Sequence, residues 1–299
     1  MGNVFRPESK PDVSETLQSQ SGDRCYAWQP LTFRGVAAFA HASYQRLFWV
    51  QTFFAVLCAV AIVWALIHAW TPVIRSAVRN LPSEQPARAE QLLYPPSAPP
   101  LLAESRHLAV LLKPEGTVAA ASDVRIEFQP RAMRVCSLFG CTVRPYPKGQ
   151  TISLTRQEAI PWWDAWEPIL LGIIGVGTGL FFLTVWTALA TIVFLFLRLY
   201  AYFADRQLTL GGAWRLSAAA FLPGTLALIA ALVLYALGTA DLIRFLLAIP
   251  GHLLIALIYL VRGTLKVHLI PTVPPTSLNP FTATPAPDKA SAEQSQPGP

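Results

Sequence analysis

Four long apolar runs constrain this chain more than any other feature of its sequence. They occupy residues 47–70, 168–197, 216–237 and 246–261. At about 1.5 Å rise per residue, a helix over the first run is about 36 Å long, enough to cross a hydrocarbon layer of about 30 Å. The composition agrees, since 53% of the residues are hydrophobic and only 13% are charged. The sequence therefore predicts a membrane all-α bundle of four transmembrane helices.

The two polar ends of the chain predict disorder. Residues 1–30 are polar and contain proline, so we expect a disordered cytoplasmic N-terminus and no cleavable secretory signal. Residues 270–299 are rich in Pro, Ala, Ser and Thr and have few large apolar side chains. This composition predicts a disordered cytoplasmic tail, because little apolar surface is available to offset the entropy of ordering.

Residues 31–46 predict a helix with one apolar face, because apolar side chains recur there at a spacing of three and four residues. Two interpretations remain open: the helix lies on the inner leaflet, or it extends the first membrane helix. In this setting, Arg34, His41 and Arg46 are expected to contact lipid headgroups and not to act as ligands.

The charges of the short loops indicate the orientation. Arg34 and Arg46 precede the first run, and the predicted cytoplasmic loop at residues 198–215 carries three arginines against a single aspartate. Because Lys and Arg in short loops favour the cytoplasmic side, we expect a multi-pass protein of the bacterial inner membrane with both termini in the cytoplasm. Residues 71–165 then face the outside.

Five tryptophans support this orientation. They cluster where the first apolar run ends and where the second begins, as expected of side chains that anchor a helix at the membrane interface. The predicted interface anchors are Trp64, Trp70, Trp162, Trp163 and Trp166.

The outer segment divides into two parts. Residues 71–105 are rich in proline and predict an extended extracytoplasmic linker. Residues 106–165 contain short stretches of strand-forming side chains and predict a small extracytoplasmic β module. Its strands are expected at residues 107–112, 124–128, 134–138, 142–144 and 151–155. With so few strands the module should have a slight core and should lean on the membrane or on a partner.

Cys136 and Cys141 frame a predicted four-residue hairpin loop. Such a loop sets the two thiols opposite each other on the oxidising side of the membrane, so we favour a structural disulfide over two free thiols. A redox-active pair is disfavoured because the spacing is C-x-x-x-x-C and not C-x-x-C. Cys25 and Cys58 should not pair, since we expect one in the cytoplasm and the other in lipid.

The glycines of the second run favour close helix packing. Gly175 and Gly179 form a G-x-x-x-G pattern, and Gly172 precedes them on the same helix. A nucleotide-binding loop is disfavoured, because Leu180 stands where its third glycine is needed and the stretch is apolar throughout. Two interpretations remain open: packing within the bundle and a homodimer contact.

Other helix-breaking and polar residues carry no functional signature. We interpret Pro223 and Pro250 as interruptions near the start of their spans and not as transport sites, because the apolar runs contain no Asp, Glu or Lys. Asp164 and Glu167 are expected in a solvated turn at the membrane surface.

We expect neither an enzyme nor a cofactor, because the sequence contains no catalytic, nucleotide-binding or metal-binding motif. The net charge of +6 does not indicate nucleic acid, since the basic residues are spread over termini and loops. The expected partners are membrane lipid and either a second copy of the chain or another envelope protein.

The region that opens the third span resembles a known family. Three segments are similar to bacterial DUF1189-type membrane proteins, which resemble the wider Yip-type group: Asp205-Arg206, residues 208–216 (LTLGGAWRL) and residues 221–225 (FLPGT). The overall arrangement is similar over about residues 30–265. This resemblance implies an integral membrane protein without established chemistry, with envelope or trafficking roles among relatives and no catalytic residue to transfer.

The leading hypothesis is a non-enzymatic membrane protein that anchors an extracytoplasmic interaction module with an envelope or scaffold role. One alternative is a transporter or transporter accessory subunit, which predicts polar groups converging on a cavity at mid-membrane. Another is an envelope sensor that signals through residues 198–215. An anchor predicts a dry bundle packed by glycine and alanine.

Overall fold

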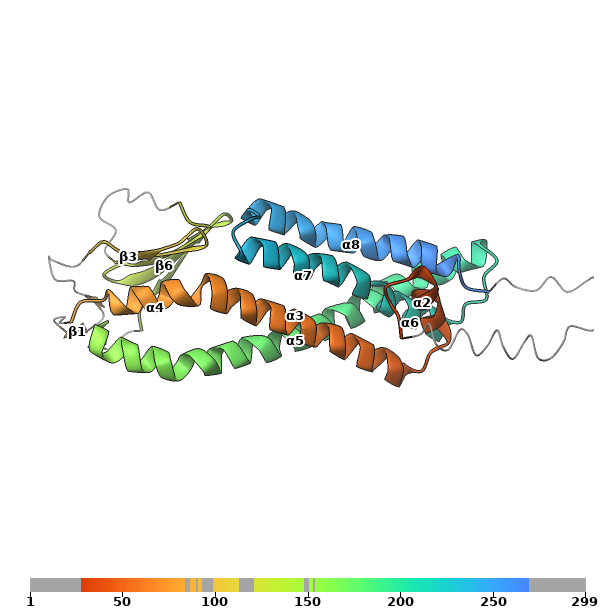
Figure 1. Cartoon of the computed structure of the whole chain (residues 1–299), viewed down its shortest axis with the longest axis horizontal. Coiled ribbons are helices and arrows are strands. Elements are labelled where there is room, and N and C mark those ends of the chain that lie inside the picture. The colour runs from red at the N-terminus through yellow and green to blue at the C-terminus, as the bar shows by residue number, and fades with distance from the viewer. Residues whose placement is uncertain are drawn as a thin grey trace, which may run out of the picture.

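The computed structural model describes residues 28–83, 87–89, 91–92, 99–112, 121–147, 151–152 and 154–268. The two segments for which we predict disorder lie almost entirely outside these residues. The molecule is elongated, with helices along its length and a sheet at one end (Figure 1). We call this the sheet end. The opposite end carries Arg34, Arg198, Arg206, Arg215 and Lys266, and we call it the basic end.

Four helices in the described part of the chain are long and apolar enough to cross a membrane. The first is α3 (Tyr44–Ala69), which continues after Trp70 into α4 (Thr71–Arg79). The others are α5 (Arg156–Phe203), then α6 (Leu210–Ala220) with α7 (Leu222–Ala236), and finally α8 (Leu242–Thr264). The predicted four long apolar helices are therefore present, with a five-stranded sheet between the first and the second.

The first two helices extend beyond their apolar runs at the sheet end. The linker predicted after the first run is wrong over α4. Pro72 occupies the first turn, where no backbone N–H is needed, and Val73 and Ala77 pack against the sheet. Helix α5 likewise begins at Arg156, inside the region assigned to the β module. Its first turns pack beside α4, so protein contacts extend the helix beyond the apolar run.

Two prolines have opposite effects on their helices. The third span is broken at Phe221, which separates α6 from α7, and Pro223 lies in the first turn of α7. Because proline lacks the backbone N–H that would continue α6, a new helix starts there. Helix α8 runs through Pro250 without ending, so the expected interruption of the fourth span is absent.

The segment before α3 folds as a separate element and does not extend α3. Helix α2 (Phe33–Ala38) and the 3-10 turn η1 (Phe39–His41) end before Ser43, whose hydroxyl accepts a hydrogen bond from the Arg46 backbone N–H and caps α3. Val36 and Phe39 are completely buried in the bundle core, where this segment packs on α6 and α8. Val36 and Phe39 on its apolar face therefore meet protein, and the contact of this segment with the inner leaflet stays a prediction.

The sheet has five strands in the order β3-β4-β5-β6-β7. Their bounds are Leu101–Glu104, Leu108–Leu112, Val124–Phe128, Ala132–Ser137 and Gly140–Pro145. Strands β4 and β5 are parallel, and the other neighbouring strands are antiparallel. A smaller sheet in the order β2-β1-β8 joins Gln91–Leu92, Ala87–Ala89 and Thr151–Ile152. Strands β1 and β2 of the smaller sheet and strand β3 of the larger one lie within residues 71–105, for which we predict an extended linker.

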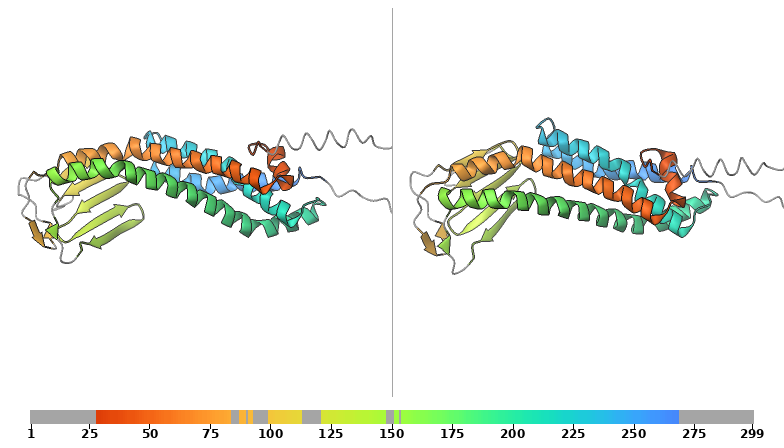
Figure 2. Two further views of the ribbon diagram at one scale, coloured as in Figure 1. Left: turned by 90° about the horizontal axis from the view of Figure 1, so that it is seen from below. Right: turned by 60° about the horizontal axis from the view of Figure 1, so that its bottom comes forward.

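Burial falls across the larger sheet. All of β4 is buried, β5 and β6 are partly buried, and all six residues of β7 are exposed. Helix α4 and the start of α5 lie along one side of the sheet (Figure 2). Leu108 and Val110 of β4 pack there with Val73 and Ala77 of α4. The sheet therefore has its core beside the helices and an open strand at its far edge.

Small side chains dominate the interior of the bundle. Fully buried alanines of the bundle are Ala190, Ala201, Ala213, Ala218, Ala219, Ala220 and Ala256. Helices α7 and α8 approach closely at Gly224, where an added Cβ would lie 2.6 Å from the backbone oxygen of His252. The buried hydroxyls of Thr225 and Thr264 donate to carbonyl oxygens of their own helices, at 3.2 and 2.8 Å. These polar side chains are satisfied locally.

Candidate functional site

Arg106, which lies between β3 and β4, connects the sheet to the helical bundle. Its guanidinium donates hydrogen bonds to the backbone oxygen of Gly238 and to the carboxylate of Asp241. Both partners belong to the turn between α7 and α8, where Gly238 adopts a left-handed φ of +76°. The ion pair of Arg106 with Asp241 thus joins the sheet to one end of the bundle.

A second contact between the same two parts is mostly buried. Tyr235 of α7 donates a hydrogen bond from its hydroxyl to Asp123 Oδ2 at 2.9 Å. His107 Nδ1 lies 3.6 Å from the same oxygen, and its ring packs edge-on against Tyr235 with centroids 4.6 Å apart. Phe245 of α8 stacks on Tyr235 with centroids 5.4 Å apart. The carboxylate of Asp123 therefore has partners from both the sheet and the bundle.

A cleft of about 460 Å³ lies beside these contacts, between the sheet and the start of α8. Its walls include the guanidinium groups of Arg106 and Arg125 and the carboxylates of Asp123 and Asp241. Ser137 and Leu138 of the β6–β7 hairpin also line it. The cleft therefore offers hydrogen-bond donors and acceptors side by side. A polypeptide backbone carries both kinds of group and would match this lining better than an ion of one sign.

The hairpin that borders this cleft contains the predicted disulfide, between Cys136 and Cys141. The two residues face each other in the strand register, with Cα atoms 4.0 Å apart. Ser137 and Gly140 also pair, so only two residues form the turn, fewer than in the predicted four-residue loop. Gly140 has a φ of +115°, which permits a turn this tight.

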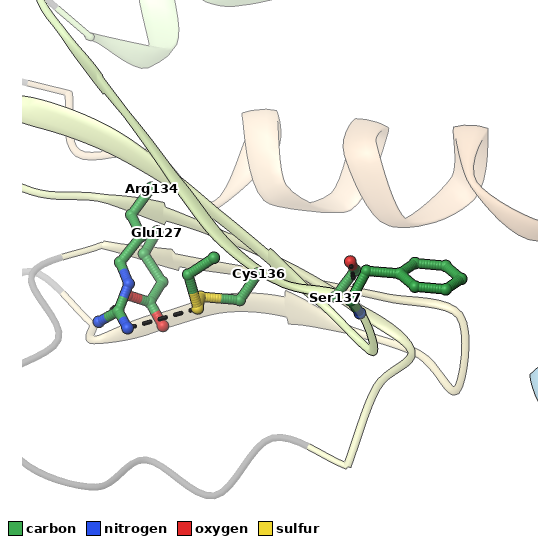
Figure 3. The surroundings of a disulfide bond; sticks show 6 residues. Glu127, Arg134, Cys136 and Ser137 are labelled. Carbon is green, nitrogen blue, oxygen red and sulfur yellow. Dashed lines mark hydrogen bonds and ion pairs between the residues drawn. A yellow bond between two sulfur atoms is a disulfide. The ribbon is translucent and has the colours of Figure 1, made fainter.

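A cross-strand ion pair lies next to the disulfide (Figure 3). Arg134 Nη1 is 3.6 Å from Glu127 Oε2, and its Nη2 is 3.3 Å from the sulfur of Cys141. Arg134 and Cys136 are two positions apart on β6, so both constraints act on the same face of the sheet. The hairpin register is therefore held by a covalent and an ionic link close to its tip.

The tip and the outer strand of this hairpin expose apolar side chains. Phe139 is 82% exposed, and Leu138 and Val143 are more than half exposed. Strand β7 is the last strand of the sheet, so its outer backbone groups have no partner strand among the described residues. An apolar tip beside an open strand edge is a surface that proteins commonly cover with a partner.

A buried carboxylate joins α5 to α4 at the sheet end. Glu167 of α5 is 8% exposed and accepts two hydrogen bonds from the guanidinium of Arg75 in α4, at 2.8 and 2.9 Å. The predicted solvated turn is therefore wrong for Glu167, because α4 supplies a charged partner in bidentate geometry. Asp164 is exposed, as expected.

Comparisons with known proteins do not place this chain in a family. No family model, curated protein or solved structure matches it. The resemblance to DUF1189-type proteins stays a prediction. Among the described residues, no group of three or more His, Cys, Asp or Glu side chains is arranged to hold a metal ion.

The five predicted interface anchors lie toward the sheet end of α3 and α5. Trp162 and Trp166 are exposed and stack with centroids 6.2 Å apart. Trp64 is partly exposed and stacks on a histidine one turn away. Trp70 and Trp163 are half-buried, and Trp70 packs against the core of the sheet module. The exposed members present aromatic surface at the level where the bundle meets the sheet.

One of the three glycines predicted to pack helices does so within this chain. An added Cβ at Gly175 would lie 3.2 Å from the side chain of Val63 in α3. At Gly172 and Gly179, no atom of the described residues would lie within 4 Å of such a Cβ. Packing within the bundle is therefore wrong for these two, because their side of α5 faces away from the other helices. The homodimer contact stays a prediction.

Sequence reasoning missed the residues that join the sheet to the bundle. Asp241 and Tyr235 lie 135 and 112 positions from their partners, Arg106 and Asp123. Only the sheet side could have been suspected from local sequence, because Arg106 and His107 stand just before β4 and Asp123 stands just before β5. Because β4 and β5 are parallel, the residues before them lie side by side, and the Asp123 backbone N–H donates to the Arg106 oxygen at 3.0 Å.

Proposed function

We propose that this protein is a non-enzymatic integral membrane protein that displays an extracytoplasmic interaction module. Its β6–β7 hairpin binds an extended segment of an envelope protein. The four apolar helices span the bacterial inner membrane, both termini lie in the cytoplasm, and the sheet lies outside. The arginines of the basic end support this orientation, because short cytoplasmic loops are enriched in them.

The observation that carries the proposal is the open edge of β7. An extended peptide can add to such an edge, where main-chain hydrogen bonds provide affinity and alternate side chains provide specificity. Phe139 and Leu138 offer apolar contacts beside this edge, and the neighbouring cleft offers charges of both signs. A partner peptide would therefore meet backbone, apolar and charged groups on one continuous surface.

The attachment of the sheet supports a scaffold role. Arg106 and Asp123 bond to groups of α7 and the α7–α8 turn, in addition to the chain connections through α4 and α5. A peptide bound at β7 would consequently be held at a fixed position relative to the helices.

The interior of the bundle favours an anchor over a transporter. Alanine is the commonest buried residue of its core, and the buried polar side chains among the described residues of the bundle are few: Gln51, Ser217, Thr225, His252 and Thr264. A transporter needs polar groups that converge on a mid-membrane cavity, so that a substrate can replace its hydration.

Site-specific photo-cross-linking in intact cells tests the proposal. A photoreactive side chain in place of Phe139 should cross-link to a partner protein. The same side chain in place of Gln157, an exposed residue at the start of α5, should not. Val143→Asp should weaken the Phe139 cross-link, because it places a charge on the binding strand. Cross-linking of Phe139 to lipid alone would contradict the proposal.

A second candidate function is a sensor that reports through residues 198–215, and the continuity of α5 favours it. This helix runs for 48 residues from the sheet to that loop. If the protein is a sensor, a cytoplasmic partner should cross-link to a photoreactive side chain in place of the exposed Gln207. This cross-link should disappear when Val143→Asp prevents peptide binding at β7. A scaffold predicts that any cross-link at Gln207 is independent of that variant.

A further inference from the structure

A cavity of about 270 Å³ opens at the basic end, where the segment before α3 meets the chain that follows α8. At about 30 Å³ per water molecule, it can hold a phosphate group together with several waters. Its ionisable lining residues are all basic: Arg34, His41, Lys266 and His268. The other lining residues are Ala37, Ala38 and Val267, so no described carboxylate lines the cavity.

The two walls come from distant parts of the chain, and packing holds them together. Tyr259 of α8 donates from its hydroxyl to the backbone oxygen of Leu31 at 2.7 Å, and its ring packs on Phe33 with centroids 4.7 Å apart. Gly263 lets α8 approach Val36, since an added Cβ would lie 3.2 Å from the Val36 side chain. The backbone of both walls is therefore in place before any ligand binds. This lowers the entropic cost of binding, because less of the chain has to be ordered.

Backbone oxygens on both walls are bonded to groups outside the cavity. Arg206 donates to the oxygen of Val267 at 2.8 Å, and the backbone N–H of Gln207 donates to the oxygen of His268 at 3.0 Å. On the other wall, Arg215 donates to the oxygen of Ala40 at 2.7 Å. Two further guanidinium groups thus add positive charge beside the cavity, which favours an anion.

The position of the cavity indicates which anion it binds. It lies where the apolar helices end at the basic end, which is the headgroup level of a membrane that these helices cross (Figure 1). Next to Arg34, the exposed side chains of Leu31 and Phe33 can contact acyl chains while the guanidinium reaches a phosphate. Basic pockets between membrane helices bind anionic headgroups in this way.

We propose that this cavity binds the phosphate group of an anionic phospholipid. Arg34 and Lys266 supply the charge on opposite walls. The site lies at the opposite end from β7 and does not depend on the peptide partner proposed for that strand.

Native mass spectrometry of the full chain in detergent, with added phosphatidylglycerol, tests the site. The double variant Arg34→Gln, Lys266→Gln should bind this lipid about 25-fold more weakly, since each basic residue near an anionic headgroup contributes roughly a factor of five. The matched control, Arg198→Gln with Arg262→Gln, removes the same charge at the same end but outside the cavity. It should bind like the wild type.

Three results would overturn the proposal. The first is an equal loss of lipid binding in both double variants, which would show that the net charge of the basic end, and not the cavity, determines binding. The second is equal affinity of the wild type for zwitterionic phosphatidylcholine. The third is a rise in Tm with inorganic phosphate but not with phosphatidylglycerol, which would assign the cavity to the free ion. Circular dichroism checks folding, and if the double variant does not fold, each single variant should bind about fivefold more weakly.

Discussion

Tyr235 of α7 donates a 2.9 Å hydrogen bond to Asp123, which immediately precedes β5, across 112 positions of sequence. The two residues belong to parts of the molecule that fold around different cores, one in the bundle and one in the sheet module. The bond is therefore a contact between those parts and not a component of either core. Its removal should loosen the attachment of the sheet to the bundle without unfolding either core.

Tyr235→Phe removes this donor and should loosen the sheet, because the Asp123 carboxylate loses a hydrogen bond in a mostly buried contact. Such a loss costs roughly 1–3 kcal/mol, so hydrogen exchange of the β4 and β5 amides should accelerate roughly 5- to 150-fold. The control Tyr259→Phe removes a phenol hydrogen bond at the basic end and should leave this exchange unchanged. Equal acceleration in both variants would contradict a docking role for Tyr235.

Glu167→Gln should destabilise the junction of α4 and α5, because it removes the charge that accepts two hydrogen bonds from Arg75. The side chain of Arg75 is 52% exposed and can regain water, so we expect a loss of about 1.5 kcal/mol. Unfolding in sodium dodecyl sulfate, followed by circular dichroism, measures it. The exposed neighbour provides the control: Asp164→Asn should change stability by less than about 0.5 kcal/mol. A similar effect of both variants would rule out the ion pair as the cause.

Replacing both Cys136 and Cys141 by serine should destabilise the hairpin by about 2 kcal/mol, the loop-entropy contribution of so short a bridge. Denaturant unfolding of the wild type with and without reductant should show the same difference, whereas the variant should not respond to reductant. The cross-link at Phe139 should weaken in parallel, because the tip loses its fixed register. An unchanged cross-link would show that the partner does not require the disulfide.

Burial raises the pKa of the Tyr146 hydroxyl to about 12. Since the unfolded side chain ionises near pH 10, the neutral phenol stabilises the fold below about pH 10, and this contribution is lost as pH rises toward about 12. The wild type should therefore lose stability over this window more steeply than Tyr146→Phe, as measured by thermal unfolding. The control Tyr202→Phe alters an exposed tyrosine of α5 and should follow the wild type. Parallel pH curves for all three would exclude Tyr146 as the cause.

The four long helices and the positions of strands β4 to β8 could be predicted from local sequence. An apolar run long enough to cross lipid has few structures available to it, so four runs predict four long helices. Strand β5 was predicted with the correct bounds, because Val124, Ile126 and Phe128 alternate with charged residues. The Cys136 and Cys141 pair followed from their short spacing across a turn.

The connection between sheet and bundle could not be predicted, because it depends on non-local pairing. Nothing in the sequence indicates that β4 and β5 are parallel, and only that pairing brings Arg106 and Asp123 together. Helix α4 was missed because its apolar face is short and becomes favourable only against the sheet. The basic cavity combines residues from both ends of the described chain, which local patterns cannot relate.

Helix α5 is longer than a single membrane crossing requires. At about 1.5 Å per residue its 48 residues measure about 72 Å along the helix, whereas a hydrocarbon core takes about 30 Å. The first turns of α5 run beside α4 along one side of the sheet (Figure 2). Under the proposed topology, shortening α5 by whole turns at its start should therefore remove support from α4 and the sheet and leave the membrane crossing at full length.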